Sequence, residues 1–153
     1  MHLAQLNVGR IRYPTDDARM AGFMDNLDRI NALAEKSPGF VWRMTGEGNN
    51  NMDVTRPDDP GMNYNLSVWR SVEDLEHFVW KTVHVRFYNR KLEWFSQISE
   101  PHFVMWPIEE SMEPSLDEAL VRLETLRSEG SSDQAYGWEH LPHLKEWMAK
   151  RCG

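Results

Sequence analysis

The sequence predicts an α+β fold of the ferredoxin-like type, in which an antiparallel sheet with the element order βαββαβ carries two helices on one face. Three observations predict it. Four segments alternate apolar and polar residues with the two-residue period of a strand, and two segments between them repeat apolar residues at helical spacing. Their order along the chain is strand, helix, strand, strand, helix, strand, followed by a helical tail.

Each element is predicted from its own pattern. The first strand covers residues 2–11, where Leu6 and Val8 point one way and Gln5 and Asn7 point the other. The remaining predicted elements are a helix between Asp17 and Ser37, strands over residues 40–45 and 62–70, one long helix over residues 71–96, a strand over residues 102–108, a helix between Ser115 and Gly130, a short strand over residues 135–138 and a terminal helix over residues 142–150. The segments SVED at 71–74 and SLDE at 115–118 are capping boxes that start two of the helices.

A long polar segment, residues 46–61, separates the second and third predicted strands. It is rich in Asn, Asp, Gly and Pro and shows no period, so we expect a loop. Loops of this length in a compact domain often act as lids or binding loops, while the same composition is also typical of disorder. The sequence leaves both alternatives open.

The composition limits the class of protein. With 153 residues, of which 41% are hydrophobic, the chain is expected to form one domain over residues 1–130, with residues 131–153 packed on it as a C-terminal extension. The net charge of −7 argues against nucleic acid and anionic membrane surfaces as partners. Cys152 is the only cysteine, and the sequence shows no signal peptide or membrane span, so a cytoplasmic location is expected.

Two predicted strands carry polar residues on the face away from their aliphatic row. Asn7 on the first strand is matched by Asn63 and Asn65 on the third, with Trp69 on the same side. Such a face would line a shared cavity. Because both helices of this fold cover one face of the sheet, we expect the polar face to be uncovered and a second copy to close it, which gives a homodimeric α+β barrel.

Several segments together resemble a known family. They are HLAQLNVGRIRYPTDDARMAGFMDNLDRINALAEKSPGFVWRM, SVWRSVEDLEHFVWKTVH followed by RKLEWF, HFVMWPI, and SLDEALVRLETLRSEG, in that order within residues 2–130. They resemble a bacterial family of unknown function in the antibiotic biosynthesis monooxygenase-like, dimeric α+β barrel superfamily. That resemblance implies a choice among cofactor-free oxygenases acting on polycyclic phenols, haem-binding and haem-degrading proteins, isomerases, dehydratases and proteins without known chemistry.

His84 is the candidate residue with the sharpest pattern. In one continuous helix Trp80 lies four residues before it and Tyr88 four residues after it, so the three side chains would share a face. The imidazole could act as a general base near neutral pH or as an axial haem ligand. The structural alternative is a hydrogen-bonded histidine that packs beside aromatic rings without a chemical role.

The favoured hypothesis is a cofactor-independent, monooxygenase-like enzyme that acts on a small aromatic or polyketide-like molecule. His84 would remove a proton from a phenol or an anthrone-like carbon, the carbanion would react directly with oxygen, and Asn63 and Asn65 would hold the developing oxyanion. The predicted substrate-binding residues are Asn7, Trp42, Trp69, Trp80, Tyr88, Trp94 and Trp106. This hypothesis requires no metal or cofactor.

Two other hypotheses are carried forward. One is a haem protein with His84 as axial ligand and cationic partners for the propionates, bound non-covalently because the chain has no CxxCH motif. Those partners would be Arg43, Arg86 and Arg90. The other is a non-catalytic ligand-binding or assembly module. A metal pair at His140 and His143 is not favoured, since Pro142 breaks the helical geometry that would align the two rings.

Overall fold

The computed structural model describes residues 1–46, 48, 50–52 and 54–141. The strands are β1 (His2–Ile11), β2 (Phe40–Arg43), β3 (Met62–Trp69), β4 (Phe95–Ser96) and β5 (Phe103–Ile108). The α-helices are α1 (Ala21–Lys36), α2 (Val72–Lys81), α3 (His84–Tyr88) and α4 (Leu116–Glu129), and the 3-10 helices are η1 (Ala18–Met20), η2 (Lys91–Glu93) and η3 (Trp138–His140). Both predicted capping boxes are confirmed, because Ser71 Oγ and Ser115 Oγ each accept a hydrogen bond from the amide three residues on.

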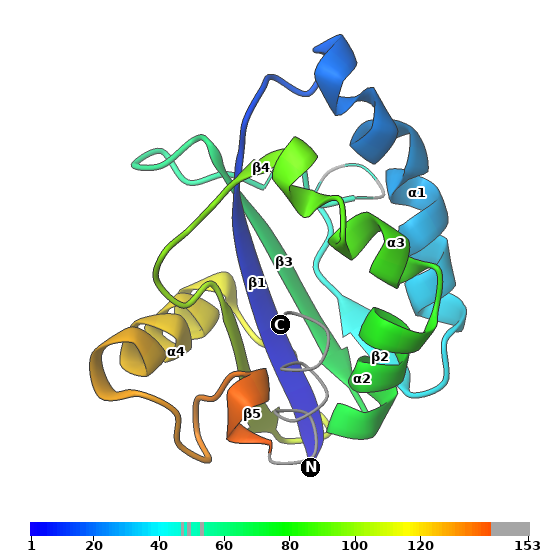
Figure 1. The fold of residues 1–153 in the computed structure, drawn as a ribbon. Helices are drawn as coiled ribbons and strands as arrows, with labels where there is room; N and C mark the ends of the chain where they lie inside the picture. The colour runs from blue at the N-terminus through cyan, green and yellow to red at the C-terminus, as the bar shows by residue number, and fades with distance from the viewer. Residues whose placement is uncertain (47, 49, 53, 142–153) are drawn as a thin grey trace.

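All strands join one antiparallel sheet (Figure 1). The order is β2-β3-β1, and both β5 and β4 pair with the remaining edge of β1, β5 along residues 2–7 and β4 at Arg10 and Ile11. Apart from the short β4, the order β2-β3-β1-β5 with helices after the first and third strands is the ferredoxin-like arrangement. The predicted α+β fold with an antiparallel sheet is confirmed.

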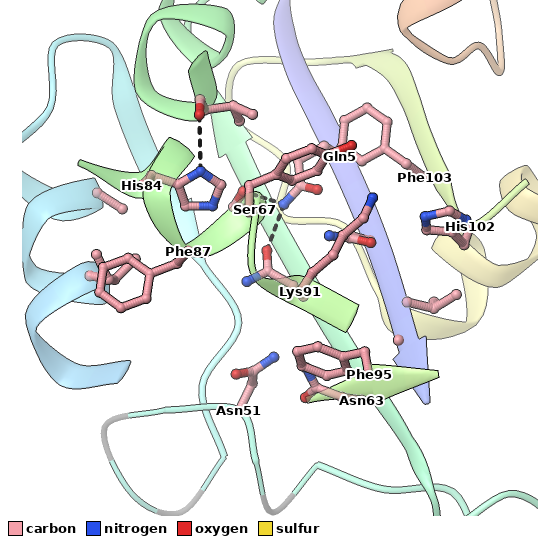
Figure 2. Close-up of a pocket in the computed structure, with 18 of the residues that line it drawn as sticks. Gln5, Asn51, Asn63, Ser67, His84, Phe87, Lys91, Phe95, His102 and Phe103 are labelled. Atoms are coloured by element: carbon pink, nitrogen blue, oxygen red, sulfur yellow. Dashed lines mark hydrogen bonds between the residues drawn. The ribbon is translucent and has the colours of Figure 1, made fainter. Parts of the chain in front are cut away.

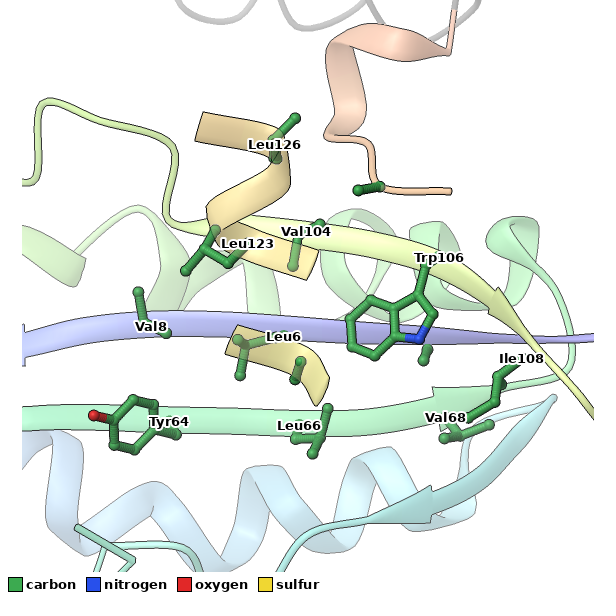
Figure 3. Packing of buried hydrophobic residues seen from close by; sticks show 13 residues of the cluster. Leu6, Val8, Tyr64, Leu66, Val68, Val104, Trp106, Ile108, Leu123 and Leu126 are labelled. Carbon is green, nitrogen blue, oxygen red and sulfur yellow. The ribbon is translucent and has the colours of Figure 1, made fainter. Parts of the chain in front are cut away.

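Helices cover both faces of the sheet: α1, α2 and α3 lie on one side and α4 lies on the other (Figure 1). Strand alternation sends Leu6 and Leu66 to the α4 side, where both side chains are almost completely buried. They form a cluster with Val104 and with Leu123 and Leu126 of α4 (Figure 3). The aliphatic row of the sheet therefore packs against α4 in a continuous hydrophobic core.

The prediction that the polar face of the sheet is uncovered is wrong. Gln5, Asn7, Asn65 and Ser67 lie on the side of α1, α2 and α3, and they line a cavity together with residues of these helices. The aliphatic row, whose burial is the most favourable, packs against α4, so α1, α2 and α3 lie over the polar row. A second copy is thus not needed to cover the polar row, and the homodimer stays a prediction.

The single helix predicted over residues 71–96 is also wrong. Helix α2 ends at Lys81, because Thr82 adopts an extended backbone conformation with φ −117° and ψ −177°. The Thr82 hydroxyl donates to the carbonyl oxygen of Phe78 at 2.6 Å and accepts from the amide of His84 at 3.2 Å. One side chain therefore satisfies a free carbonyl at the end of α2 and a free amide at the start of α3.

The described part of the C-terminal extension, residues 131–141, returns to the sheet. Tyr136 exchanges two backbone hydrogen bonds with Met105 of β5, at 2.7 and 2.9 Å. The short strand predicted over residues 135–138 is therefore present only as an isolated antiparallel bridge at Tyr136. The terminal helix predicted over residues 142–150 lies outside the described residues.

Candidate functional site

A cavity of about 430 Å³ lies between the polar face of the sheet and helices α1, α2 and α3. The strands β1 and β3 form its floor, α1 forms one wall, and the segment from α2 to β4 forms the other. Figure 2 shows Gln5, Asn63 and Ser67 on the sheet, with His84 and His102 at opposite sides of the pocket. The volume lies within the range of about 300–1,000 Å³ that is usual for small-molecule sites.

The floor of the cavity is a hydrogen-bond network. Gln5 Nε2 donates to Asn65 Oδ1 at 2.8 Å and to Ser67 Oγ at 2.6 Å, and Trp69 Nε1 donates to the same hydroxyl oxygen at 3.0 Å. The antiparallel register creates this network by placing Gln5 opposite Ser67. Because the Ser67 oxygen already accepts two bonds, its own proton points away from both donors. The Ser67 hydroxyl and the Asn65 amide nitrogen are therefore donors that this network leaves for a ligand.

His84 stands at the start of α3, with Nδ1 at 3.1 Å from the carbonyl oxygen of Val79. A carbonyl only accepts, so Nδ1 carries the proton and Nε2 keeps its lone pair in the neutral ring. Burial lowers the pKa of His84 below its ordinary value, against a smaller opposite effect of the Val79 hydrogen bond. Figure 2 shows the bond to Val79 on one edge of the ring and the second nitrogen on the opposite edge.

Aromatic side chains close the cavity where α1 meets β4. Trp94 is buried, and its ring lies 5.8 Å from that of Phe23 on α1. Phe95 of β4 lies on β1 at Gly9, where the Cβ of any other residue would come within 2.8 Å of the Phe95 ring. Gly9 therefore allows β4 to lie across the end of β1 and to bring Phe95 to the pocket.

Seven of the ten predicted site residues line this cavity: Asn7, Asn63, Asn65, Trp69, His84, Tyr88 and Trp94. The structure does not bring Trp42, Trp80 and Trp106 into it. Trp106 is completely buried on the α4 side of the sheet, because strand alternation points it away from the polar row. Trp42 packs against the same cluster, because a register shift between Phe40 and Trp42 turns Trp42 to the α4 side. Trp80 lies behind Tyr88, with ring centroids 4.8 Å apart, since the break after α2 removes the shared helical face.

Other lining residues were not predicted as site residues. Ser67 belongs to the alternating polar row, so its position was readable from the sequence. Lys91 comes to the cavity because the predicted long helix is broken, whereas His102 comes to it beside β1, where its carbonyl oxygen accepts a hydrogen bond from the amide of Val8 at 2.9 Å. Asn31 on α1 is buried, and its Nδ2 has no hydrogen-bond partner in the described part of the chain. Asn51 shows that the predicted loop contributes to the cavity, and its side chain donates to the carbonyl oxygen of Tyr64.

The three arginines predicted to bind haem propionates do not converge on the cavity. Arg43 lines it, but its guanidinium pairs with Glu35 at 3.0 Å. Arg86 and Arg90 line a separate, smaller cavity. The polar floor and this arrangement of cations are a poor fit for haem, which requires an apolar slot with cationic groups at its rim.

The described ranges of the chain contain neither a group of side chains that could hold a metal ion nor a helix that could span a membrane. No group of three or more His, Cys, Asp or Glu side chains within them could hold a metal ion. His140 Nε2 instead lies 3.2 Å from a carboxylate oxygen of Asp133, and His143 falls outside those ranges. None of the helices within the same ranges is long and apolar enough to span a membrane.

Comparison with known families gives a match over nearly the whole chain. A family described as a domain of unknown function (DUF3291) matches residues 2–152. The chain belongs to this family. The predicted resemblance to a family without an assigned activity is therefore confirmed, and no curated protein matches the chain.

Solved structures show a similar fold at low sequence identity. A conserved protein from Methanosarcina mazei Go1 is 10% identical with a TM-score of 0.52, and the alignment covers 71% of this chain and 94% of that chain. A protein from Nitrosomonas europaea that is provisionally described as an antibiotic biosynthesis monooxygenase is 11% identical with a TM-score of 0.47, over 63% and 82% of the two chains. One from Chloroflexus aurantiacus J-10-fl with the same description is 15% identical with a TM-score of 0.45, over 71% and 95%.

Proposed function

We propose that the protein is a cofactor-independent, monooxygenase-like enzyme that binds a small aromatic or polyketide-like molecule in this cavity. The observation that carries the proposal is the state of His84. Its Nδ1 proton is held by the Val79 carbonyl, and its Nε2 lone pair belongs to a neutral ring that lines a cavity with aromatic walls. Such a ring is ready to accept a proton from a bound substrate.

In the proposed reaction Nε2 removes a proton from an acidic carbon, such as the methylene of an anthrone-like substrate. The carbanion supplies the electrons that reduce O2. One oxygen atom becomes the new carbonyl oxygen and the other leaves as water with the two methylene hydrogens, so no external reductant is needed. Because burial lowers the pKa of His84, its ring stays unprotonated near neutral pH and available as the base.

The sheet supports the same reaction with hydrogen-bond donors. The carbanion places its charge on a neighbouring oxygen, and fixed donors that meet this oxygen lower the barrier. The Ser67 hydroxyl and the Asn65 amide are held by bonds to Gln5 and Trp69, so they need little reorganisation during the reaction. Asn63 lies in the same lining, but its atom without a partner in the described part of the chain is the acceptor Oδ1, which would meet a donor of the ligand such as a phenol hydroxyl.

The other two hypotheses use the same cavity. A haem protein with His84 as axial ligand is less well supported, because Arg86 and Arg90 lie at a separate cavity and the floor is polar. A non-catalytic binding module would hold the aromatic ligand without turnover, so activity measurements distinguish it from the enzyme.

A homodimer and a cytoplasmic location remain part of this proposal. The superfamily resemblance supports the dimer, and the single cysteine of the chain is typical of a reducing compartment. The native mass of the purified protein measures the first, and a band at twice the chain mass of 18.0 kDa is the expected result.

Oxygen uptake with anthrone-like and naphthol substrates tests the reaction. His84→Ala and His84→Gln should each lower the rate by about 10²–10⁴-fold, the usual contribution of a general base. Glutamine keeps a donor for the Val79 carbonyl, so a loss in both variants cannot come from unfolding of the α2 end alone. His77→Ala is the matched control, because His77 is exposed on α2 and lies outside the cavity lining. Unchanged uptake in the His84 variants would refute the role, and a Soret band after addition of hemin, lost in His84→Ala, would favour the haem protein.

A further inference from the structure

The cavity lining is free of acidic residues, although the protein is acidic. Asp and Glu make up 24 of the 153 residues, yet none of them lines the cavity in the described part of the chain. At the average frequency of this chain, about five would be expected in a lining of this size. The charged side chains in the lining are Arg43 and Lys91, and both are basic. The charged side chains of the cavity are therefore positive, although the whole chain has a net charge of −7.

Among the described residues, Lys91 is the charged side chain of this lining without an acidic partner. Its side chain is half-buried, and its ammonium lies 4.1 Å from the centroid of the Tyr88 ring. Figure 2 shows it reaching across the middle of the pocket. Within the described residues no carboxylate lies within salt-bridge distance of Lys91, whereas Arg43 is paired with Glu35. A ligand anion in this cavity could therefore form a charge-assisted contact with the Lys91 ammonium.

Three polar groups around the cavity are also available as donors. The Ser67 hydroxyl and the Asn65 amide are left as donors by the network on the floor. On the opposite wall, Asn31 is only 8% exposed and its Nδ2 has no partner among the described residues. A ligand oxygen with a negative charge would meet donors from the sheet, from α1 and from η2.

We propose that the molecule bound here is a flat aromatic anion, with a carboxylate or an ionised phenol oxygen that pairs with the Lys91 ammonium. This inference rests on the proposed function, because it names the substrate class of the same cavity. The aromatic walls contact the ring system, and Lys91 selects the charge. In the reaction proposed above, Lys91 is a binding residue and takes no part in the proton transfer.

Two fluorescent probes with the same ring system test the charge selection. 1-Anilinonaphthalene-8-sulfonate carries an anionic group, and N-phenyl-1-naphthylamine is its uncharged counterpart. The wild-type protein should bind the anionic probe at least about tenfold more tightly in fluorescence titrations, as one charge-assisted contact allows. Lys91→Met should weaken the anionic probe by about ten- to a hundredfold and leave the neutral probe unchanged. Lys91→Arg should keep most of the preference.

Lys81→Met is the matched control, because Lys81 is exposed at the end of α2 and does not line the cavity. Equal affinity for both probes, no binding of either, or a preference that survives in Lys91→Met would overturn the inference. These titrations need no turnover, so their failure leaves the His84 reaction standing. A Lys91-dependent preference without oxygen uptake would instead refute the enzyme and support a protein that binds aromatic anions.

Discussion

Ser67→Ala is expected to destabilise the protein, because it removes one acceptor that two buried donors share. Gln5 Nε2 and Trp69 Nε1 lie 2.6 and 3.0 Å from Ser67 Oγ, and these two residues are only 4% and 1% exposed. Leaving one buried donor unsatisfied costs about 1–3 kcal/mol. Trp69 Nε1 loses its partner here and Gln5 Nε2 keeps only its bond to Asn65, while a water from the adjacent cavity would recover part of the loss. We therefore expect the free energy of unfolding to fall by about 2–4 kcal/mol.

Urea unfolding measures this change as a lower midpoint with an unchanged slope. Ser96→Ala is the control, because Ser96 is exposed on β4 and should change stability by less than about 0.5 kcal/mol. In a Trp69→Phe background one of the two donors is already gone, so Ser67→Ala should cost about 1 kcal/mol less than in the wild type. A Ser67→Ala variant as stable as the control, or an equal cost in both backgrounds, would refute the shared-acceptor reasoning.

Three further predictions concern single residues. Gly39→Ala should lower the free energy of unfolding by more than about 1 kcal/mol, since Gly39 has φ +83° and a Cβ there would overlap the Asp74 carboxylate. Gly48→Ala is the control, because a Cβ at Gly48 would meet open space, and both variants are measured by urea unfolding. Because burial lowers the pKa of His84, stability should be full above about pH 6.5 and fall as the pH drops through the folded pKa, and His84→Gln should reduce that fall in urea titrations at several pH values. Ser115→Ala should cost about 1 kcal/mol by removing the cap of α4, and an unchanged midpoint would contradict this.

Sequence periodicity was sufficient for the order of elements and for most strand positions. The alternation of residues 2–11 predicts β1 with both of its ends, and the capping boxes predict the starts of α2 and α4. The same alternation grouped Asn7 with Asn65 on one face, and the structure places both in one cavity. These features depend on neighbours close in sequence, whose spacing a linear pattern records.

The break after α2 could not be predicted from local spacing. Residues 71–96 have the apolar repeat of a single helix, and the Thr82 hydroxyl competes with the helix by bonding Phe78 and His84. That break sends Lys91 across the pocket and leaves the Val79 carbonyl free for His84. A serine or threonine within a helical pattern is usually tolerated, so the pattern alone does not separate the two outcomes.

By itself the sequence determined an antiparallel α+β domain with one aliphatic and one polar row on its central strands. Only the tertiary structure decided which row faces which helices: α4 closes the aliphatic row, while α1, α2 and α3 stand over the polar row and enclose a cavity. The physical reason is that burial depends on the summed apolar area of elements far apart in the chain. The acid-free lining and the place of Lys91 in it follow from that assembly, because the described residues that line the cavity come from ten different elements and from the loops between them.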